Sequence, residues 1–174
     1  MQCPLLNIDL IPLTKGKFAI VDKGDGIRLS LVKWGCNRQK NQTYAMHTYR
    51  VGYKTGFVLM HRVIIHAMPG DMVDHINGNG LDNRKCNLRI CTSSQNNYNS
   101  KPKKNIVGRT SKYKGVSWVE RTKGWKANIC KNGIRIHLGY YKREMDAAYS
   151  YDLAARKLFG QFAYVNFQKT AEAI

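Results

Sequence analysis

The sequence lacks the features that direct a chain to a membrane, to secretion or to a structural zinc site. It has no stretch that approaches the 18 or more apolar residues needed to span a bilayer. Its start, Met1-Gln2-Cys3-Pro4, has no charged residue followed by an apolar run, so we expect no secretory signal. No two cysteines form a Cys-x-x-Cys pair, which disfavours a zinc knuckle and favours free thiols in a reducing cytoplasm. The cysteines are Cys3, Cys36, Cys86, Cys91 and Cys130.

Acidic residues are also scarce. The chain has 11 Asp and Glu against 29 Lys and Arg, a formal net charge of +18. Binding of such a chain to a polyphosphate is favoured by counterion release. The apolar content of 43% is ordinary for a globular protein, so the charge does not mark a disordered tail. The composition therefore predicts a nucleic acid as the partner, with no membrane and no small-molecule substrate.

The 174 residues allow one ordinary domain or two small ones, and the charge pattern favours two. Residues 98–112 hold five basic residues and no acidic one, lack apolar periodicity and contain Pro102. This composition is typical of a linker between residues 1–97 and 113–174. It is either a solvated connector or an arm that follows the DNA backbone through Lys101, Lys103 and Lys104.

The first 70 residues read as hairpins and one short helix. Apolar and β-branched runs predict strands over residues 18–21, 27–32, 49–53 and 57–60, separated by Gly, Asp and Asn. Residues 60–68 predict a short helix ended by Pro69-Gly70.

Residues 71–100 combine a strand, a turn, a second strand and a helix. We expect strands over 71–76 and 88–91, because Asn77-Gly78-Asn79-Gly80 cannot continue a strand. Thr92 and Gln95 form a capping box, which predicts a helix from there to about Ser100. This helix carries Asn96.

A carboxylate, an imidazole and carboxamides recur along this unit, in Asp74, His75, Asn87 and Asn96. Such a set can hold one divalent cation beside one general base. Asp74-His75 alone would also suit a plain hydrogen-bonded loop, but Asn87 and the capped helix favour the site. His61 could support the site from the preceding helix, although a packed structural histidine is the simpler interpretation.

The last 60 residues predict three strands and a helix. The run of strands begins with the segment Lys112 to Trp118, and the second and third strands span residues 125–131 and 135–141. Asn132-Gly133 between the last two is a strong signal for a hairpin turn. Alternation places Trp125, Ala127, Ile129, Ile134, Ile136, Leu138 and Tyr140 on an apolar face, and Lys126, Asn128, Cys130, Arg135 and His137 on a polar face. A helix over 144–159, stopped by Gly160, has a stripe of small apolar residues that can cover the apolar face.

The first half resembles an HNH endonuclease of the phage homing type. The likeness is carried by Asp-His-Ile-Asn-Gly-Asn at 74–79, Asp-Asn-Arg at 82–84, Asn-Leu-Arg-Ile-Cys-Thr at 87–92 and Gln-Asn-Asn at 95–97. Residues 11–17 and Met60-His61-Arg62 add to it. The resemblance implies a ββα-metal nuclease core with His75 as general base, Asp74 and Asn96 as metal ligands, and Asn87 holding the loop backbone. Asn96 stands where the lettered motif has His, which favours one Mg²⁺ or Mn²⁺ per site.

The second half resembles an AP2/ERF DNA-binding domain. The likeness is carried by Tyr-Lys-Gly-Val at 113–116, Leu-Gly at 138–139, Ala-Ala-x-x-Tyr-Asp-x-Ala-Ala at 147–155 and Asn166-Phe167. It implies a three-stranded sheet laid in the major groove. The matching contact positions are Lys114, Ser117, Asn128, Cys130, Arg135, His137 and Tyr151. Several differ from the plant pattern, so no sequence preference follows.

We therefore expect an α+β protein that is a metal-dependent homing endonuclease acting on double-stranded DNA, as a monomer that nicks or a dimer assembled on DNA. Arg84, Arg89 and Lys126 are further candidate DNA contacts, although Arg89 could equally form a salt bridge within the fold. The expected location is cytoplasmic, in a phage-infected bacterial host or otherwise inside a cell, and not secreted. The alternative is a DNA-binding regulator with a degenerate nuclease core. An RNA-binding protein has only the charge in its favour.

Overall fold

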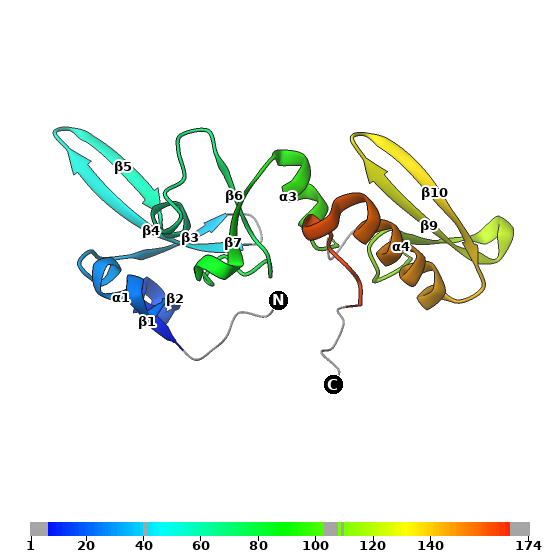
Figure 1. The fold of residues 1–174 in the computed structure, drawn as a ribbon, viewed down its shortest axis with the longest axis horizontal. Coiled ribbons are helices and arrows are strands. Elements are labelled where there is room, and N and C mark those ends of the chain that lie inside the picture. Colours follow the sequence, from blue (N-terminus) through cyan, green and yellow to red (C-terminus); the bar gives the residue numbers. More distant parts are fainter. Residues whose placement is uncertain (1–6, 40–41, 103–107, 109, 168–174) are drawn as a thin grey trace. The chain divides into compact units, whose positions relative to one another are not determined.

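The computed structural model describes residues 7–39, 42–102, 108 and 110–167, and it has an α+β fold (Figure 1). The fold class is the expected one, including the three-stranded antiparallel sheet near the C-terminus. The chain divides into two compact units, with the boundary between Ser93 and Ser94. Within the described ranges no helix is long and apolar enough to cross a membrane.

The first unit is built from antiparallel hairpins. Its strands are β1 (Ile8–Pro12) paired with β2 (Phe18–Asp22), a three-stranded sheet of β3 (Gly35–Gln39), β4 (Gln42–Val51) and β5 (Lys54–Leu59), and β6 (Met72–His75) paired with β7 (Leu88–Cys91). Two helices, α1 (Lys23–Ser30) and α2 (Met60–Ile64), and the 3₁₀ turns η1 (Thr14–Gly16) and η2 (Lys85–Asn87) connect them.

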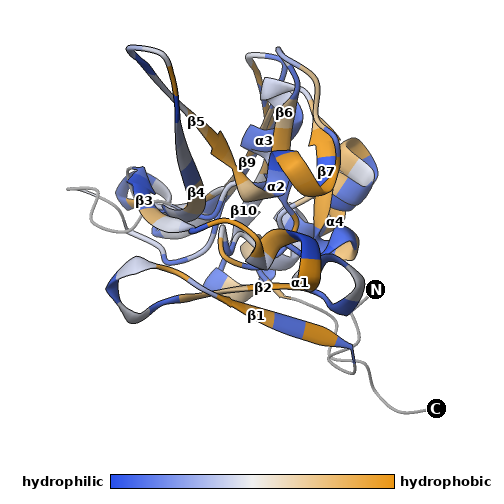
Figure 2. Ribbon diagram, turned by 90° about the vertical axis from the view of Figure 1, so that its left-hand side faces the viewer, coloured by the Kyte–Doolittle hydropathy of each residue, from blue (hydrophilic) through white to orange (hydrophobic). Residues whose placement is uncertain are grey.

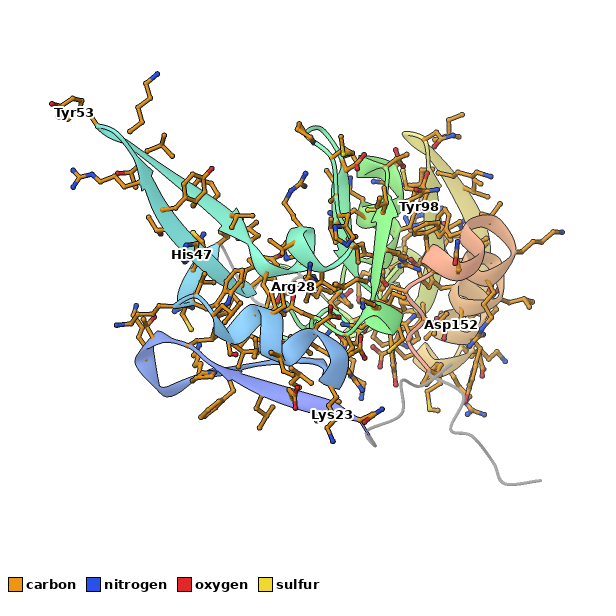
Figure 3. All side chains as sticks on the ribbon, turned by 60° about the vertical axis from the view of Figure 1, so that its left-hand side comes forward. Lys23, Arg28, His47, Tyr53, Tyr98 and Asp152 are labelled. Atoms are coloured by element: carbon orange, nitrogen blue, oxygen red, sulfur yellow. The ribbon has the colours of Figure 1, made fainter. Side chains whose placement is uncertain are left out.

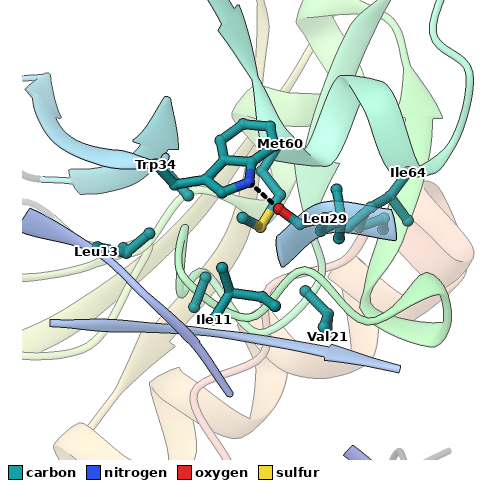
Figure 4. Close-up of a cluster of buried hydrophobic side chains, with 10 residues drawn as sticks. Ile11, Leu13, Val21, Leu29, Trp34, Met60 and Ile64 are labelled. Carbon is teal, nitrogen blue, oxygen red and sulfur yellow. Dashed lines mark hydrogen bonds between the residues drawn. The ribbon is translucent and has the colours of Figure 1, made fainter. Parts of the chain in front are cut away.

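One hydrophobic core serves all of these elements. Its buried members come from the first hairpin, α1, β4, α2, the residue before β3 and the start of β7. Figure 4 shows Ile11, Leu13, Val21, Leu29, Trp34, Met60 and Ile64 meeting there. Trp34 is 3% exposed, and its indole N–H donates to the Leu29 carbonyl over 2.7 Å. That bond satisfies the one polar atom of the ring, so burial of the large side chain carries little desolvation cost. The hydrophobic C-terminal end of β5 leads into this core (Figure 2).

The strand expected over residues 27–32 was wrong, because residues 27–30 belong to helix α1 and Leu31 caps its C-terminal end. In a strand, Ile27, Leu29 and Leu31 would share one face. In the structure only Leu29 of these three is buried, and the side chains of Ile27 and Leu31 are each 80% exposed. Gly26 allows α1 to approach β1 closely, since a Cβ there would lie 1.9 Å from the Asp9 carboxylate.

Helix α2 is shorter than expected and ends at Ile64, not Met68. His66 adopts a left-handed conformation, with φ of 52°, which the helix cannot continue. The Arg62 guanidinium holds the following turn by donating to the carbonyls of Met68 and Asp71, each over 2.6 Å.

The second unit contains α3 (Ser93–Asn99) from Ser94 onward, β8 (Val116–Val119), β9 (Gly124–Lys131), β10 (Ile134–Tyr141) and α4 (Glu144–Phe159), with 3₁₀ turns η3 (Glu120–Thr122) and η4 (Gly160–Phe162). The sheet order is β10-β9-β8, and α4 has the predicted bounds. Buried small residues of α4, such as Ala148 and Ala155, let the helix pack closely on Ala127 and Ile129 of β9.

A β-bulge changes the predicted alternation in β10. The register shifts between His137 and Gly139, after which Tyr140 pairs with Lys126 and Tyr141 with Trp125. Tyr141 therefore packs on the core, whereas Tyr140 is 50% exposed on the face that carries Lys126. The assignment of Tyr140 to the apolar face was wrong, because a bulge inserts one residue and reverses the pleat beyond it.

The cysteines differ from expectation at one position. Cys36, Cys91 and Cys130 are free thiols, whereas Cys86 is disulfide-bonded. The expectation of free thiols was therefore wrong for Cys86.

Candidate functional site

The β6–β7 hairpin places Asp74 and His75 at the end of a strand. In its antiparallel register Asp74 pairs with Arg89, and His75 with Leu88. Both side chains are buried, with 5% of Asp74 and 6% of His75 exposed. A carboxylate and an imidazole are rarely buried side by side without partners, so the contacts of each define what the site can do.

The loop between the two strands is cross-linked by Asn87. Its side-chain oxygen accepts from the Asn77 backbone N–H over 3.0 Å. Its amide nitrogen donates to the Asn77 side-chain oxygen and to the Asp82 carbonyl, over 3.1 and 2.7 Å. Asn87 thus holds two separate turns of the loop.

The same loop is fastened to β2 and β4. Ile20 of β2 donates to the Leu81 carbonyl over 2.8 Å and accepts from the Asn83 N–H over 2.7 Å. The Gln42 side chain donates to the Gly78 carbonyl over 2.8 Å. A Cβ on Gly80 would lie 2.5 Å from the Thr43 carbonyl, so only glycine allows this approach. The loop is therefore rigidly placed over the site.

Asn83 lies against Nε2 of His75 and favours the tautomer that carries the proton on that nitrogen. The side-chain oxygen of Asn83 lies 3.3 Å from His75 Nε2, and its amide nitrogen donates instead to the Leu81 carbonyl. Nε2–H is then the donor, which leaves Nδ1 as the basic nitrogen of the neutral ring. Burial lowers the pKa of His75, against the raising effects of Asn83, Asp74 and Asp82. The imidazole is thus neutral at neutral pH, as a general base must be.

Two further rings enclose His75. The His61 ring from α2 meets it edge-on, with centroids 5.0 Å apart, and the Tyr44 ring of β4 lies 5.8 Å away. His61 is 6% exposed, and burial, with His75 and Arg62 nearby, lowers its pKa to about 3. Its Nδ1 is buried without a hydrogen-bond partner among the described residues. His61 is therefore a neutral wall of the site.

Two arginines that we expected to contact DNA form ion pairs around the site. Arg89 donates to Asp74 Oδ2 from Nη2 and Nε, over 2.6 and 2.9 Å. Arg84 holds both carboxylate oxygens of Asp82, over 2.8 and 2.7 Å. Burial raises the pKa of Asp82, but the Arg84 bonds outweigh it and the net pKa is lowered. A DNA contact by either arginine would be additional to its ion pair, and both contacts remain predictions.

The predicted metal ligands lie in different units. Asp74 belongs to the first unit, and the half-buried Asn96 lies on α3 in the second. Across the part of the chain that is described, no three His, Cys, Asp or Glu residues gather at metal-binding distance. The predicted donor set needs no such cluster, because it combines one carboxylate with one amide oxygen. Hard oxygen donors of this kind fit Mg²⁺ or Mn²⁺.

The second unit presents a polar sheet face. The register places Ser117 opposite Lys126, Arg135 opposite Cys130, and His137 opposite Asn128. His137 Nδ1 lies 3.3 Å from the Asn128 side-chain oxygen, and the His137 ring is 4.8 Å from that of Tyr140. Because α4 covers the opposite face, this one is open for a partner. Tyr140 was not among the predicted contacts, since the bulge that exposes it has no clear sequence signal.

Two other predicted contacts of this unit lie elsewhere. Tyr151 is 3% exposed and packs in the core, so the expectation of a DNA contact from it was wrong. The Lys114 ammonium donates to the carbonyls of Tyr98 and Ser100, each over 2.7 Å, and its pKa is lowered to about 8 by burial. Lys101 is exposed, whereas Lys103 and Lys104 lie outside the described residues.

Lys114 and Tyr98 fasten α3 to the second unit. The Tyr98 ring stacks on Phe159 of α4, with centroids 3.8 Å apart and planes at 7°, and its hydroxyl donates to Asn132 over 2.8 Å. Lys114 reaches the carbonyls at the C-terminal end of α3, where a cation is favoured by the helix dipole. The helix that carries Asn96 is thus held by residues of the sheet domain.

The end of the second unit is pinned by Asp152. This residue is 1% exposed, and its carboxylate accepts from the backbone N–H groups of Asn166 and Phe167, over 2.7 and 2.8 Å. Asn166 in turn accepts from the Lys114 N–H over 2.7 Å. The Tyr-Asp and Asn-Phe motifs quoted for the AP2/ERF resemblance are therefore structural.

Comparisons with known proteins identify the family of this chain. The HNH endonuclease family profile matches residues 58–98, which span α2 to α3. An uncharacterised HNH endonuclease of Acanthamoeba polyphaga mimivirus is 34% identical over 158 residues, covering 87% of this chain and 76% of that protein. The chain belongs to the HNH endonuclease family. Protein 3.8 of Escherichia phage T7 is 34% identical over 95 residues, 54% of this chain and 74% of that protein.

The second half of this HNH endonuclease is similar to plant proteins. An AP2/ERF and B3 domain-containing transcription repressor of Arabidopsis thaliana is 41% identical over 64 residues, which are 36% of this chain but only 17% of that protein. The similarity concerns one AP2-like DNA-binding module, and it carries over nothing of the remaining plant protein.

Proposed function

We propose that this HNH endonuclease is a divalent-metal-dependent DNA hydrolase with His75 as general base. The observation that carries the proposal is the buried His75, whose Nε2–H is directed to Asn83 and whose neighbour in sequence is the Asp74 carboxylate. Among the described histidines, His75 combines a predicted HNH position, a fixed tautomer and a lowered pKa.

The residues suggest one direct displacement at phosphorus. His75 Nδ1 accepts a proton from a water molecule while the oxygen of that water attacks the phosphorus atom. The bond from phosphorus to the 3′ oxygen then breaks. Asp74 and Asn96 would hold one Mg²⁺ or Mn²⁺ ion, which when bound stabilises charge on the phosphate and the leaving oxygen. Asn87 keeps the loop in place over the site, and His61 excludes water from one side of the base.

The sheet of the second unit delivers the nuclease to DNA in this proposal. Its polar face carries Lys126, Arg135, Asn128 and His137, with Ser117 and Tyr140 beside them. The major groove of B-DNA is wide enough for such a strand surface. The AP2-like relatives support this role.

The phage-type resemblance favours a homing role. Because each chain has one site, the number of DNA strands cut depends on how many chains act together. A monomer would nick one strand, and two chains assembled on DNA would cut both. Mapping the 5′ ends produced on each strand distinguishes these outcomes.

The alternative is a DNA-binding regulator with an inactive core. Supercoiled plasmid incubated with the wild-type chain separates the two functions. The proposal predicts nicked or linear DNA with Mg²⁺ or Mn²⁺ and none with EDTA. Plasmid that stays supercoiled with every divalent metal, yet is retarded in a gel by the protein, would favour the regulator.

A further inference from the structure

The β4–β5 hairpin extends beyond the core of the first unit. Its register runs from Met46 paired with Leu59 to Val51 paired with Lys54, with a two-residue turn at Gly52-Tyr53. Met46 and Leu59 at its base are half-buried, but residues 48–55 are all exposed. In Figure 3 Tyr53 marks the far end of the hairpin and points away from the rest of the unit. A two-stranded ribbon of this length has no core of its own to stabilise it.

The projecting ribbon exposes large hydrophobic side chains. Tyr49 is 46% exposed, Val51 69%, Phe57 60% and Tyr53 fully exposed. The Tyr49 ring is nonetheless held in place, because it lies across Gly56, where a Cβ would come within 2.6 Å of it. Such a set on one protrusion is unfavourable in water and indicates a surface that a partner covers.

The charge of this region identifies the partner. Residues 35–59, which make up the whole β3-β4-β5 sheet, contain four Lys and Arg and no Asp or Glu. Arg50 and Lys54 lie on the ribbon itself, and both are exposed. A surface with cations and no compensating acid fits a polyanion, and aromatic side chains among the cations fit the edges of bases.

We infer that the β4–β5 hairpin is a second DNA-binding element, separate from the sheet of the second unit, and that it lies in the major groove of duplex DNA. A two-stranded β-ribbon fits that groove. Arg50 and Lys54 contact phosphates, and Tyr53 and Val51 at the tip make apolar contacts with base edges. This inference rests on the proposed function for its substrate, duplex DNA.

A row of rings connects the ribbon to the core. Trp34 meets His47 edge-on with centroids 5.9 Å apart, and His47 lies against Tyr49 at 6.5 Å. His47 is itself fixed, since its Nδ1 lies 2.9 Å from the Lys33 carbonyl. These contacts hold the base of the ribbon as far as Tyr49, which limits the entropy lost there when the ribbon binds.

The test uses the full chain and a fluorescent 40-base-pair duplex of arbitrary sequence, in EDTA so that no cleavage occurs. The Arg50→Gln/Lys54→Gln variant should bind at least about tenfold more weakly at 0.1 M salt, and the slope of log K against log salt should fall by about 2. The matched control, Lys23→Gln/Lys157→Gln, removes the same charge from exposed helical positions and should retain both values. Equal affinities and slopes for all three proteins would overturn the inference.

A second measurement reports contact at the tip. When the duplex is added, Tyr53→Trp should gain more protection from acrylamide quenching than the wild type, whose own three tryptophans set the background. Ile27→Trp, at another exposed position of the same unit, should change no more than the wild type. Equal quenching of Tyr53→Trp with and without DNA would contradict the inference. A third result would also contradict the inference. In that case the wild type is a dimer without DNA, the Arg50→Gln/Lys54→Gln variant is a monomer, and the two bind DNA with equal affinity.

The two proposals fail separately. If the ribbon variants lose affinity but the wild type never cuts DNA, the hairpin is a DNA-binding element and the nuclease mechanism is wrong. If the wild type cuts DNA and the ribbon variants bind DNA with wild-type affinity, the nuclease proposal stands and the hairpin is not a DNA-binding element.

Discussion

Asp74 and Arg89 face one another across the β6–β7 ladder, and Arg89 Nη2 and Nε lie 2.6 and 2.9 Å from the same carboxylate oxygen. The guanidinium balances the charge of a buried carboxylate that we expect to bind a cation. A metal ion that reaches Asp74 therefore meets a residue already held in position by a neighbouring strand.

Replacing Arg89 tests this relationship. Arg89→Gln leaves the buried Asp74 carboxylate without its cation, which should lower the free energy of unfolding by about 3–5 kcal/mol. Because Mg²⁺ can supply the missing positive charge, it should raise the melting temperature of the variant more than that of the wild type. Differential scanning fluorimetry with Mg²⁺ or EDTA measures both effects. The Arg89→Gln/Asp74→Asn double variant should recover stability and lose the Mg²⁺ response, and equal Mg²⁺ responses in all proteins would contradict this account.

Asn83 is expected to act as a positioning residue for His75. Asn83→Ala should reduce the cleavage rate at saturating enzyme by at least about tenfold, because either ring nitrogen can then carry the proton. Affinity for DNA in EDTA should not change. Asn83→Asp should restore the hydrogen bond and shift the acidic limb of the rate profile to higher pH, since a carboxylate stabilises the imidazolium. A profile that coincides with that of the wild type would remove Asn83 from the mechanism.

His61 should make the fold sensitive to acid. Its pKa is about 3 in the folded protein against about 6.5 in an unfolded chain, so the folded state binds fewer protons. The contribution is complete above pH 6.5 and is lost as the pH falls from there toward 3, at up to about 1.4 kcal/mol per pH unit. Urea unfolding at several pH values between 7.5 and 4.5 should give a shallower pH dependence for His61→Gln than for the wild type. The exposed control His137→Gln should follow the wild type, and parallel curves for all three would refute the assignment.

Lys114 and Arg135 should differ in their response to salt. Arg135 is exposed on the polar sheet face, so Arg135→Gln should weaken DNA binding and lower the salt slope by about 1. Lys114 is engaged by the carbonyls of α3, so Lys114→Gln should destabilise the second unit but leave the slope unchanged. Titrations at four salt concentrations measure the slopes. A slope reduced equally by both substitutions would return Lys114 to the DNA interface.

The sequence was most informative where local signals agreed with packing. Glu144 to Phe159 combined a periodic stripe with a terminal glycine, and the helix has those bounds. The prediction for residues 27–32 was wrong because their alternating apolar pattern is typical of a strand. The close approach of Gly26 to Asp9, which places the helix against β1, is a contact between residues far apart in the sequence and has no local signal. Strands β1 and β3 were not predicted, since Pro12 and the polar run Asn37-Arg38-Gln39 hide their pairing.

The sequence predicts the residue types of the site but not their contacts. Asp74, His75 and Asn87 were identified from the motif, but the role of Asn83 depends on a hydrogen bond across eight residues that no spacing rule specifies. The ion pairs of Arg84 and Arg89 likewise depend on where the loop and β7 place them. Lys114 matched a DNA-contact position by resemblance. Its hydrogen bonds to the carbonyls of Tyr98 and Ser100 are visible only in the structure.

The central claim is tested most directly by the cleavage rate of His75→Ala. Linear or plasmid DNA is incubated in Mg²⁺ with the wild type or the variant at concentrations that saturate binding, and dissociation constants are measured in EDTA. The account predicts that cleavage by the variant falls by at least about 100-fold while its dissociation constant stays within about twofold of the wild type. Cleavage at the wild-type rate by a folded His75→Ala protein would contradict it.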